Sequence, residues 1–502
     1  MIKINNNKDL IKGRLLFRNI LWVGLSKIVP IVSAIIFIPI LIKNFGDERF
    51  GLLSIVWVII GLATVLDLGL GSAVVKFVSE KIGKNKENEI IGIFGLSWLI
   101  ISILGIILSL ILILLRKQII TSIFNIEPTL VAEADSALIY TALALPFVFS
   151  NSVFISILKA HQEFKLITII TSINSLFNYL VPLLVLMFTK DFSHVVLAIV
   201  LVKLIVFMAY MFNLIFDKGW LFGFKLNYLR GQWAPVLRFG GWVSISNLVS
   251  PILSYTDRFM VASIISVAAV TYYVTPMEMV VKVGSLAMPI VSVLFPAIAN
   301  AQANNTEKLP TLLNTGLITI VLLSFPILYF LGLFSFEILE LWVSPELAIK
   351  SSLVLKVLTV GILLRSMTYM PYSYLHGTNK PDVVAKIHLI ELITYMILLS
   401  VGLKYWGIIG AATAFSIRSF IDYILLSIWA DKNNDQTGIF TKYFPKAFIL
   451  LTVFIVTINI NEPITKSIVY LFVVISFIWI MWRFNMNQDI RNFIKSLGAN
   501  KT

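Results

Sequence analysis

Residues 90–115 read IIGIFGLSWLIISILGIILSLILILL and contain no charged side chain. The hydrocarbon core of a bilayer is about 30 Å thick, and a helix needs roughly 20 residues to cross it. This stretch is therefore long enough to span a membrane as a helix. Strands that cross a membrane are about half as long and alternate in polarity, so the pattern favours helices.

The composition of the whole chain agrees with this stretch. Of 502 residues, 58% are hydrophobic and 13% are charged, and the mean hydropathy is +0.93. Soluble domains carry about 25% charged residues. The chain has no cysteine, which excludes disulfides, thiolate zinc sites and cysteine nucleophiles. The first apolar run is too long for a cleavable signal, and we expect it to remain as an anchor.

The same apolar pattern recurs along the chain and predicts fourteen spans. They cover approximately residues 17–43, 50–72, 90–115, 135–158, 166–189, 193–216, 236–263, 272–299, 311–334, 352–375, 383–403, 407–429, 443–460 and 464–482. The fold class is therefore an all-α polytopic membrane protein.

The distribution of Lys and Arg predicts the orientation, because cytoplasmic loops are enriched in both. With the N-terminus inside, 25 of these residues lie on the cytoplasmic side and eight on the other. An even number of spans then places both termini in the cytoplasm. Topology thus accounts for most of the formal charge of +14, and we expect no nucleic-acid partner.

A weak repeat divides the chain into two six-helix lobes. At an offset of 220 residues, the matching pairs include Arg18 with Arg238, Trp22 with Trp242 and Ser26 with Ser246. Six spans separate the copies, so both point the same way, as in transporters built from parallel repeats. The predicted parts are an N-tail (1–16), an N-lobe (17–216), an inter-lobe loop (217–235), a C-lobe (236–429), two further spans (443–482) and a cytoplasmic tail (483–502).

Twelve ionisable residues fall inside the predicted spans, at a cost of about 2.5–3.5 kcal/mol each before pairing. They are Lys27, Asp67, Lys203, Asp257, Arg258, Glu278, Lys282, Lys356, Arg365, Glu391, Arg418 and Asp422. Two pairs with i,i+4 spacing, Glu278 with Lys282 and Arg418 with Asp422, can form ion pairs within one helix.

The cations near the middle of the membrane outnumber the acids and indicate a path for an anion. A guanidinium can bind phosphate oxygens through two parallel hydrogen bonds. We assign anion binding to Lys27, Lys203, Arg258, Arg365 and Arg418, with Arg365 and Lys27 ranked first. Coupling to a cation, H⁺ or Na⁺, is assigned to Asp67, Asp257 and Glu391. Glu391 has no cation at i±4, which leaves a coupling role or an ion pair with Lys27, Lys203 or Arg365.

Enzyme signatures are not found. The sequence has no GxxxxGK[ST] loop and no HExxH, and its four histidines are scattered. No connecting loop exceeds about twenty residues, which disfavours a membrane glycosyltransferase or polymerase with an external catalytic domain. We expect a transporter without a cofactor.

Three motifs add a resemblance to a known family. NFGDERFGL (44–52), DLGLG (67–71) followed by Lys76-Phe77-Val78, and SYTDRF (254–259) resemble segments of the O-antigen and polysaccharide flippases. These belong to the multidrug/oligosaccharidyl-lipid/polysaccharide (MOP) exporter superfamily. The resemblance is densest over about residues 15 to 300.

This resemblance implies a MATE-like V of two lobes and export of an undecaprenyl-pyrophosphate-linked oligosaccharide across the bacterial inner membrane by ion-coupled alternating access. It also implies partners among polysaccharide polymerases and chain-length proteins, beside membrane lipids. A cation-coupled multidrug exporter and a lipid II flippase of the same fold stay open as alternatives. The multidrug reading would favour a net acidic path, whereas the spans hold seven basic and five acidic residues.

The topology can be tested by cysteine labelling, because the native chain has no cysteine. A cysteine placed between residues 76 and 86 should react with a membrane-impermeant maleimide only after the cells are opened. Lys190→Cys, on the opposite side, should react in intact cells. Labelling of the 76–86 position from outside would overturn the predicted topology.

Overall fold

A computed structural model describes residues 13–65, 70–83, 87–124, 126–214, 253–288, 290–291, 294, 298, 308–378, 380–432, 438, 440–457, 460, 462–481 and 483. Helices are the only regular elements within these ranges, which confirms the all-α fold class. Nine of the described helices are long and apolar enough to cross a membrane. The count of fourteen spans stays a prediction, and the repeat positions 238–246 and the loop 217–235 lie outside the described residues.

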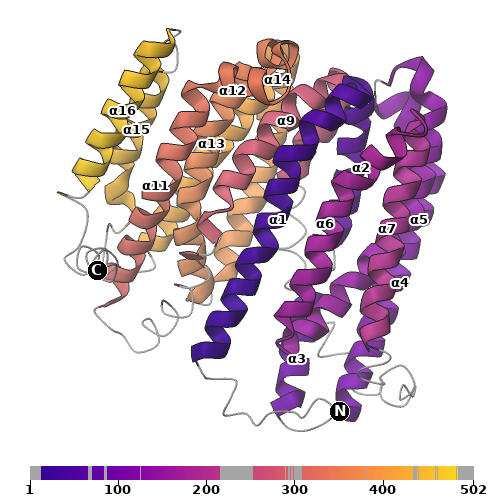
Figure 1. The fold of residues 1–502 in the computed structure, drawn as a ribbon. Coiled ribbons are helices and arrows are strands. Elements are labelled where there is room, and N and C mark those ends of the chain that lie inside the picture. Colours follow the sequence, from indigo (N-terminus) through magenta and orange to yellow (C-terminus); the bar gives the residue numbers. More distant parts are fainter. Residues whose placement is uncertain are drawn as a thin grey trace, which may run out of the picture. The chain divides into compact units, whose positions relative to one another are not determined.

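The chain forms two compact units, residues 1–271 and 272–502. The first unit holds a helix over residues 253–264 and the named helices in Figure 1, which are α1 (Gly13–Phe45), α2 (Asp47–Val65), α3 (Leu70–Gly83), α4 (Glu87–Gln118), α5 (Val131–Ala160), α6 (Phe164–Leu186) and α7 (Phe192–Phe212). Short π and 3-10 turns at Ile119–Ile123 and Pro128–Leu130 join α4 to α5. Helix α3 was not predicted, because residues 76–86 were expected to form a loop.

Helix α5 is the centre of the first unit. It packs against α2, α3, α4 and α7. Of the most apolar 18 residues in the stretch Pro128–Ala160, 72% are buried. Helix α1 packs on α6 along the same unit (Figure 1). The central place of α5 explains its small residues, since Ala137, Ala142 and Ala144 let neighbouring helices approach closely.

The second unit contains α11 (Lys308–Leu333), α12 (Ser335–Trp342), α13 (Pro345–Gly377), α14 (Pro381–Lys432), α15 (Phe444–Thr457) and α16 (Pro463–Ile480). A further helix, α9 (Val267–Gly284), crosses the division between the units, and a 3-10 turn at Thr441–Tyr443 precedes α15. Helix α13 is central here and packs against α11, α12 and α14. Its start is fixed by Ser344, whose hydroxyl accepts the backbone N–H of Leu347, followed by Pro345 in the first turn.

Helix α14 is a hairpin of two helices. Its chain reverses at Gly407, where φ is 57° and ψ is −140°, a conformation that favours glycine. The two arms touch backbone to backbone, because a Cβ added to Gly410 would lie 1.9 Å from the carbonyl oxygen of Gly402. The arms correspond to the predicted spans 383–403 and 407–429.

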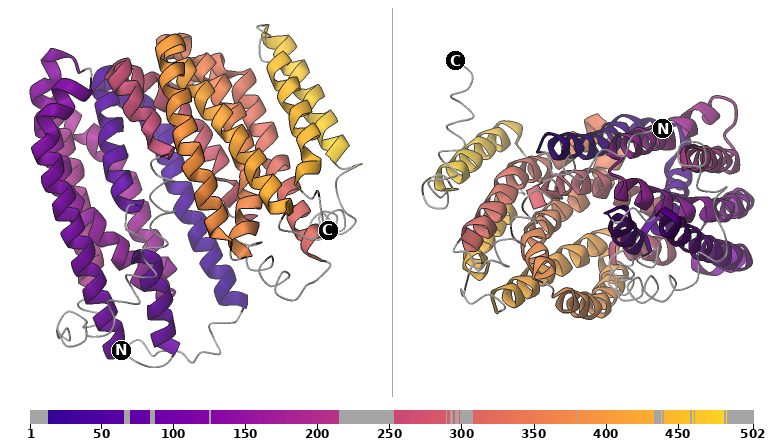
Figure 2. Two further views of the ribbon diagram at one scale, coloured as in Figure 1. Left: turned by 180° about the vertical axis from the view of Figure 1, so that it is seen from behind. Right: turned by 90° about the horizontal axis from the view of Figure 1, so that it is seen from below.

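The last two helices, α15 and α16, are joined to the rest of the second unit by polar contacts. The Lys466 ammonium donates to Glu337 Oε1 over 2.6 Å, and the Tyr329 hydroxyl donates to Thr457 Oγ1 over 2.9 Å. Helix α16 packs on α11 (Figure 2). These contacts hold α15 and α16 on the unit although most of their apolar side chains are exposed.

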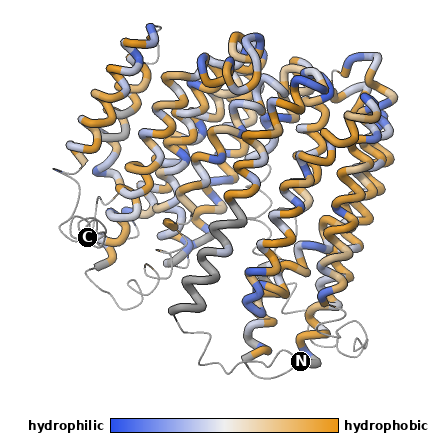
Figure 3. The backbone as a smooth tube through the Cα atoms, viewed as in Figure 1, coloured by the Kyte–Doolittle hydropathy of each residue, from blue (hydrophilic) through white to orange (hydrophobic). Residues whose placement is uncertain are grey.

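The exposed surface of the helices is apolar. On α4, Leu114 and Leu110 are 75% and 54% exposed, and on α16 Phe472 is 70% exposed. Figure 3 shows the hydrophobic colour running along the helices in both units. Such a surface is stable in lipid, so this is a multi-pass membrane protein.

The close contact at Gly410 predicts a sensitive position. Gly410→Ala should lower the free energy of unfolding by about 1–3 kcal/mol, because the new methyl group meets rigid backbone. Gly61→Ala is the control, since its Cβ would make an ordinary 3.5 Å contact with the Tyr255 hydroxyl. Thermal unfolding in detergent measures both. Equal melting temperatures for the two variants would show that the hairpin arms do not touch there.

Candidate functional site

Two of the predicted site residues meet across the α14 hairpin. Arg418 Nε lies 3.8 Å from Glu391 Oε2, with Glu391 fully buried and Arg418 9% exposed. The guanidinium of Arg418 also lies over the ring of Tyr395, 5.1 Å from its centroid. An aromatic face attracts a cation. Arg418 is thus held between a carboxylate and a ring inside the unit.

This ion pair corrects the sequence analysis. The sequence indicated Lys27, Lys203 or Arg365 as an ion-pair partner for Glu391, and the structure shows Arg418 instead. The i,i+4 pairing of Arg418 with Asp422 stays a prediction. The structure places Glu391 beside Arg418 because the hairpin brings together residues that are far apart in sequence. Spacing rules within a single helix cannot detect such a contact. The other predicted pair is confirmed, with Lys282 Nζ 3.4 Å from Glu278 Oε2.

His388 joins the same place and was missed from sequence. Its Nε2 lies 3.9 Å from Asp422 Oδ1, and ligand atoms of His388, Glu391 and Asp422 all lie within 4.8 Å of one another. The sequence analysis gave His388 no role in the site. One signal was present in the sequence, because His388 and Glu391 are spaced i,i+3 and share a helix face.

Arg365 approaches this group from α13. Its guanidinium carbon lies 6.0 Å from the ring centroid of Phe415, on the second arm of α14. It is close enough to His388 for an electrostatic interaction, and its side chain is half-buried. Among the described residues no carboxylate forms an ion pair with Arg365. The second unit thus holds two guanidinium groups that both interact electrostatically with His388, and a guanidinium can bind an anionic oxygen.

Lys203 lies in the first unit and is stabilised differently. Its ammonium donates to Asn174 Oδ1 over 2.9 Å and to Asn178 Oδ1 over 3.1 Å, both on α6. The side chain is 7% exposed, and in the described parts of the chain no acid pairs with it. Two neutral amides solvate the cation without cancelling its charge, so Lys203 keeps its attraction for an anion.

Asp257 and Arg258 are also buried, in the helix over residues 253–264. The backbone N–H of Arg258 donates to Asp257 Oδ1 over 2.8 Å, and the Arg258 guanidinium lies 5.2 Å from the ring centroid of Tyr255. Lys27 is on α1, but its side chain and the whole of Asp67 lie outside the described residues.

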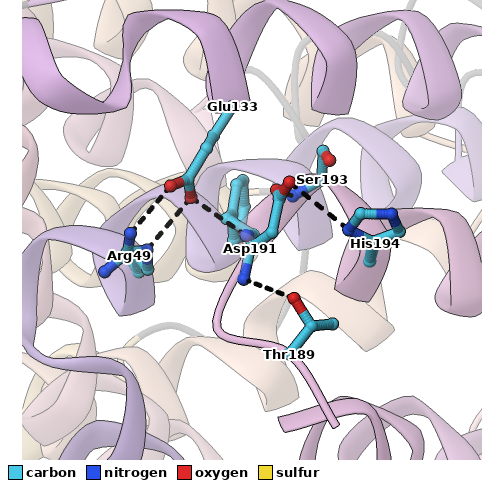
Figure 4. A network of polar contacts seen from close by, with 7 residues as sticks. Arg49, Glu133, Thr189, Asp191, Ser193 and His194 are labelled. Atoms are coloured by element: carbon cyan, nitrogen blue, oxygen red, sulfur yellow. Dashed lines mark hydrogen bonds and ion pairs between the residues drawn. The ribbon is translucent and has the colours of Figure 1, made fainter.

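The motif at residues 44–52 forms a polar network at one end of the first unit (Figure 4). Arg49 donates to both carboxylate oxygens of Glu133, over 3.0 and 2.7 Å, and Glu133 also accepts the backbone N–H of Phe192. Burial raises the pKa of Asp191, but hydrogen bonds from Ser193 outweigh it and leave this pKa below its usual value. The network ties the starts of α2, α5 and α7 together, so the role of Arg49 is structural.

The Glu391–Arg418 contact predicts a rescue. Arg418→Gln should lower the free energy of unfolding by about 3–5 kcal/mol, because it leaves a buried carboxylate without its cation. Adding Glu391→Gln should recover most of this loss. Lys386→Gln, which removes an exposed pair with Asp382 on the same helix, should cost under about 1 kcal/mol. A double variant as unstable as Arg418→Gln alone would contradict the pairing in thermal melts.

Solved structures with a similar fold include two transporters. The chain is similar to a lipid II flippase, MurJ, in an inward closed conformation, with a TM-score of 0.68, 18% identity and coverage of 93% of this chain and 99% of that one. An inward-facing MATE family multidrug transporter of the MOP superfamily gives a TM-score of 0.68 at 13% identity, covering 85% and 96%. At these identities the likeness shows the fold alone.

Sequence relatives are more informative. A Shigella flexneri protein named as an O-antigen transporter is 26% identical over 415 residues, which are 82% of this chain and 96% of the relative. The lipopolysaccharide biosynthesis protein WzxC of Escherichia coli (strain K12) is 24% identical over 411 residues, 80% of this chain and 78% of that one. The model of one family, described as polysaccharide biosynthesis protein, matches residues 16–302. More than half of the sequence is thereby matched, and the chain belongs to the polysaccharide biosynthesis protein family of membrane proteins.

Proposed function

We propose that this protein is a flippase that moves an undecaprenyl-pyrophosphate-linked oligosaccharide, such as an O-antigen repeat unit, across the bacterial inner membrane. The family and the names of both sequence relatives support this proposal. The observation that carries the mechanism is Arg365, a half-buried guanidinium among apolar helices that forms no ion pair with any described carboxylate. A charge in that position requires a partner, and an anionic ligand provides one.

The pyrophosphate is the part of the substrate that these cations recognise. As a diester it carries two negative charges, and each guanidinium can donate two parallel hydrogen bonds to phosphate oxygens. Arg365 and Arg418 provide this grip in the second unit. Lys203 has used two of its three N–H donors on Asn174 and Asn178, which leaves one for the ligand. Lys27 and Arg258 are further candidates for anion binding in the first unit.

Transport requires no bond of the substrate to be made or broken, so the protein acts as a transporter rather than an enzyme. Alternating access exposes the cationic path first to the cytoplasm and then to the other side. Glu391 binds the coupling cation in this scheme, because its carboxylate oxygens accept no hydrogen bond within the described part of the chain and its contact with Arg418 is 3.8 Å long. Asp257 and Asp67 are further coupling candidates.

The cellular setting follows from the substrate. Lipid-linked repeat units are made on the cytoplasmic side, and both termini of the flippase lie there. The predicted lobes, residues 17–216 and 236–429, provide the two moving bodies, with residues 443–482 appended. Polymerases and chain-length proteins that consume the repeat unit are its functional partners.

Deletion of the gene tests the proposed function. Lipid-linked repeat units should accumulate on the cytoplasmic leaflet, surface polysaccharide should be lost, and resistance to cationic drugs should not change. Fractionated lipids, surface polysaccharide gels and drug sensitivity are the measurements, with a plasmid copy as the control. Normal polysaccharide with reduced efflux of cationic dyes would support a multidrug exporter instead, and lysis through loss of peptidoglycan would support a lipid II flippase.

The role of Arg365 gives a second test. Arg365→Lys keeps the charge but loses the two-pronged grip, so the transport rate in proteoliposomes should fall about tenfold, as expected for one charged hydrogen bond. Folding should remain normal. Arg116→Lys, which alters a guanidinium paired with Asp135 at the end of α4, is the matched control and should transport normally. Full transport by Arg365→Ala would remove this residue from the path.

A further inference from the structure

His388, Glu391 and Asp422 form a cluster in which three carboxylate oxygens accept no hydrogen bond from the described residues, although Glu391 Oε2 lies 3.8 Å from Arg418 Nε. Both carboxylate oxygens of Glu391 and Oδ1 of Asp422 are buried and accept no hydrogen bond from the described residues. Glu391 is fully buried and Asp422 is 8% exposed. Buried carboxylate oxygens in this state bind a proton or a cation.

The donor set indicates which cation. One imidazole nitrogen and two carboxylates are ligands that Zn²⁺, Mn²⁺ and related divalent ions accept, whereas Mg²⁺ sites are built from oxygen. Ligand atoms on one such ion lie about 2.0–2.2 Å from it, so they are at most about 4.4 Å apart. The ligand atoms here are within 4.8 Å of one another, and small side-chain rotations close the difference.

The charge of the surroundings indicates a second ligand. With Arg418 and Arg365 nearby, a divalent ion bound to Glu391 and Asp422 would leave an excess of two positive charges among apolar helices. A pyrophosphate diester carries two negative charges and restores the balance.

We propose that His388, Glu391 and Asp422 bind a divalent transition-metal cation that enters the second unit together with the pyrophosphate of the substrate. The metal site rests on the cluster geometry, and only the accompanying anion rests on the proposed function. The cation at Glu391 is then a divalent metal, in place of the H⁺ or Na⁺ expected for a lone carboxylate. A bound metal must raise the affinity for pyrophosphate by the same factor by which bound pyrophosphate raises the affinity for the metal, because linkage is reciprocal.

Co²⁺ is the probe for the metal site, since its visible absorption bands change when nitrogen and carboxylate ligands replace water. The purified full chain in detergent should bind one Co²⁺, and Zn²⁺ should displace it. His388→Gln, Glu391→Gln and Asp422→Asn should each weaken Co²⁺ binding at least tenfold. His194→Gln is the control, because His194 lies 3.3 Å from Asp191 but is exposed. His388→Gln removes no charge, and its melting temperature reports that the variant is folded.

Two results would overturn the proposal. One is a protein that binds no Co²⁺, and the other is Co²⁺ binding that His388→Gln leaves unchanged. In proteoliposomes, a chelator should lower transport of the pyrophosphate-linked lipid at least tenfold, and Zn²⁺ or Mn²⁺ should restore it. Transport that ignores the chelator would overturn the accompanying role of the metal. Absence of any transport would contradict the proposed function, while the Co²⁺ titration would still decide the metal site.

Discussion

The cost of placing charge among apolar helices is the constraint on which this structure depends. Lipid and packed side chains cannot solvate an ion, so each buried ionisable group must find a partner from the protein or from a ligand. Glu391 and Arg418 meet this requirement with each other, at 3.8 Å across a helix hairpin. The close backbone contact of Gly402 and Gly410 allows this pairing, because bulkier residues would separate the two arms of the hairpin.

The two units stabilise their buried cations in different ways. In the second unit, the Glu391 carboxylate compensates Arg418. In the first, Lys203 is solvated by Asn174 and Asn178 and stays a net cation. A compensated cation can exchange its partner for an incoming anion, whereas a solvated one adds a new attraction. The described part of the first unit thus holds a solvated ammonium, and that of the second unit holds a compensated guanidinium.

Much of the fold could be predicted from the sequence, because hydropathy depends on nearby residues alone. The spans at 383–403 and 407–429 reproduce the arms of α14, and i,i+4 spacing identified the Glu278–Lys282 pair. Contacts between helices could not be predicted from hydropathy or from spacing within one helix. The partner of Glu391 and the proximity of His388 to Asp422 depend on how the hairpin arms face each other, which one sequence does not specify. The motif around Arg49 was recognised, but its link to Glu133 on α5 needed the structure.

The hairpin of α14 also bears on how the chain enters the membrane. A short reversal at Gly407 lets both arms leave the translocon together, so Glu391 and Arg418 can partition into lipid as an ion pair. Neither charge then has to cross the apolar interior alone, and the barrier to insertion falls. The contact between Glu391 and Arg418 thus shapes the candidate site and also eases insertion of the hairpin into the membrane.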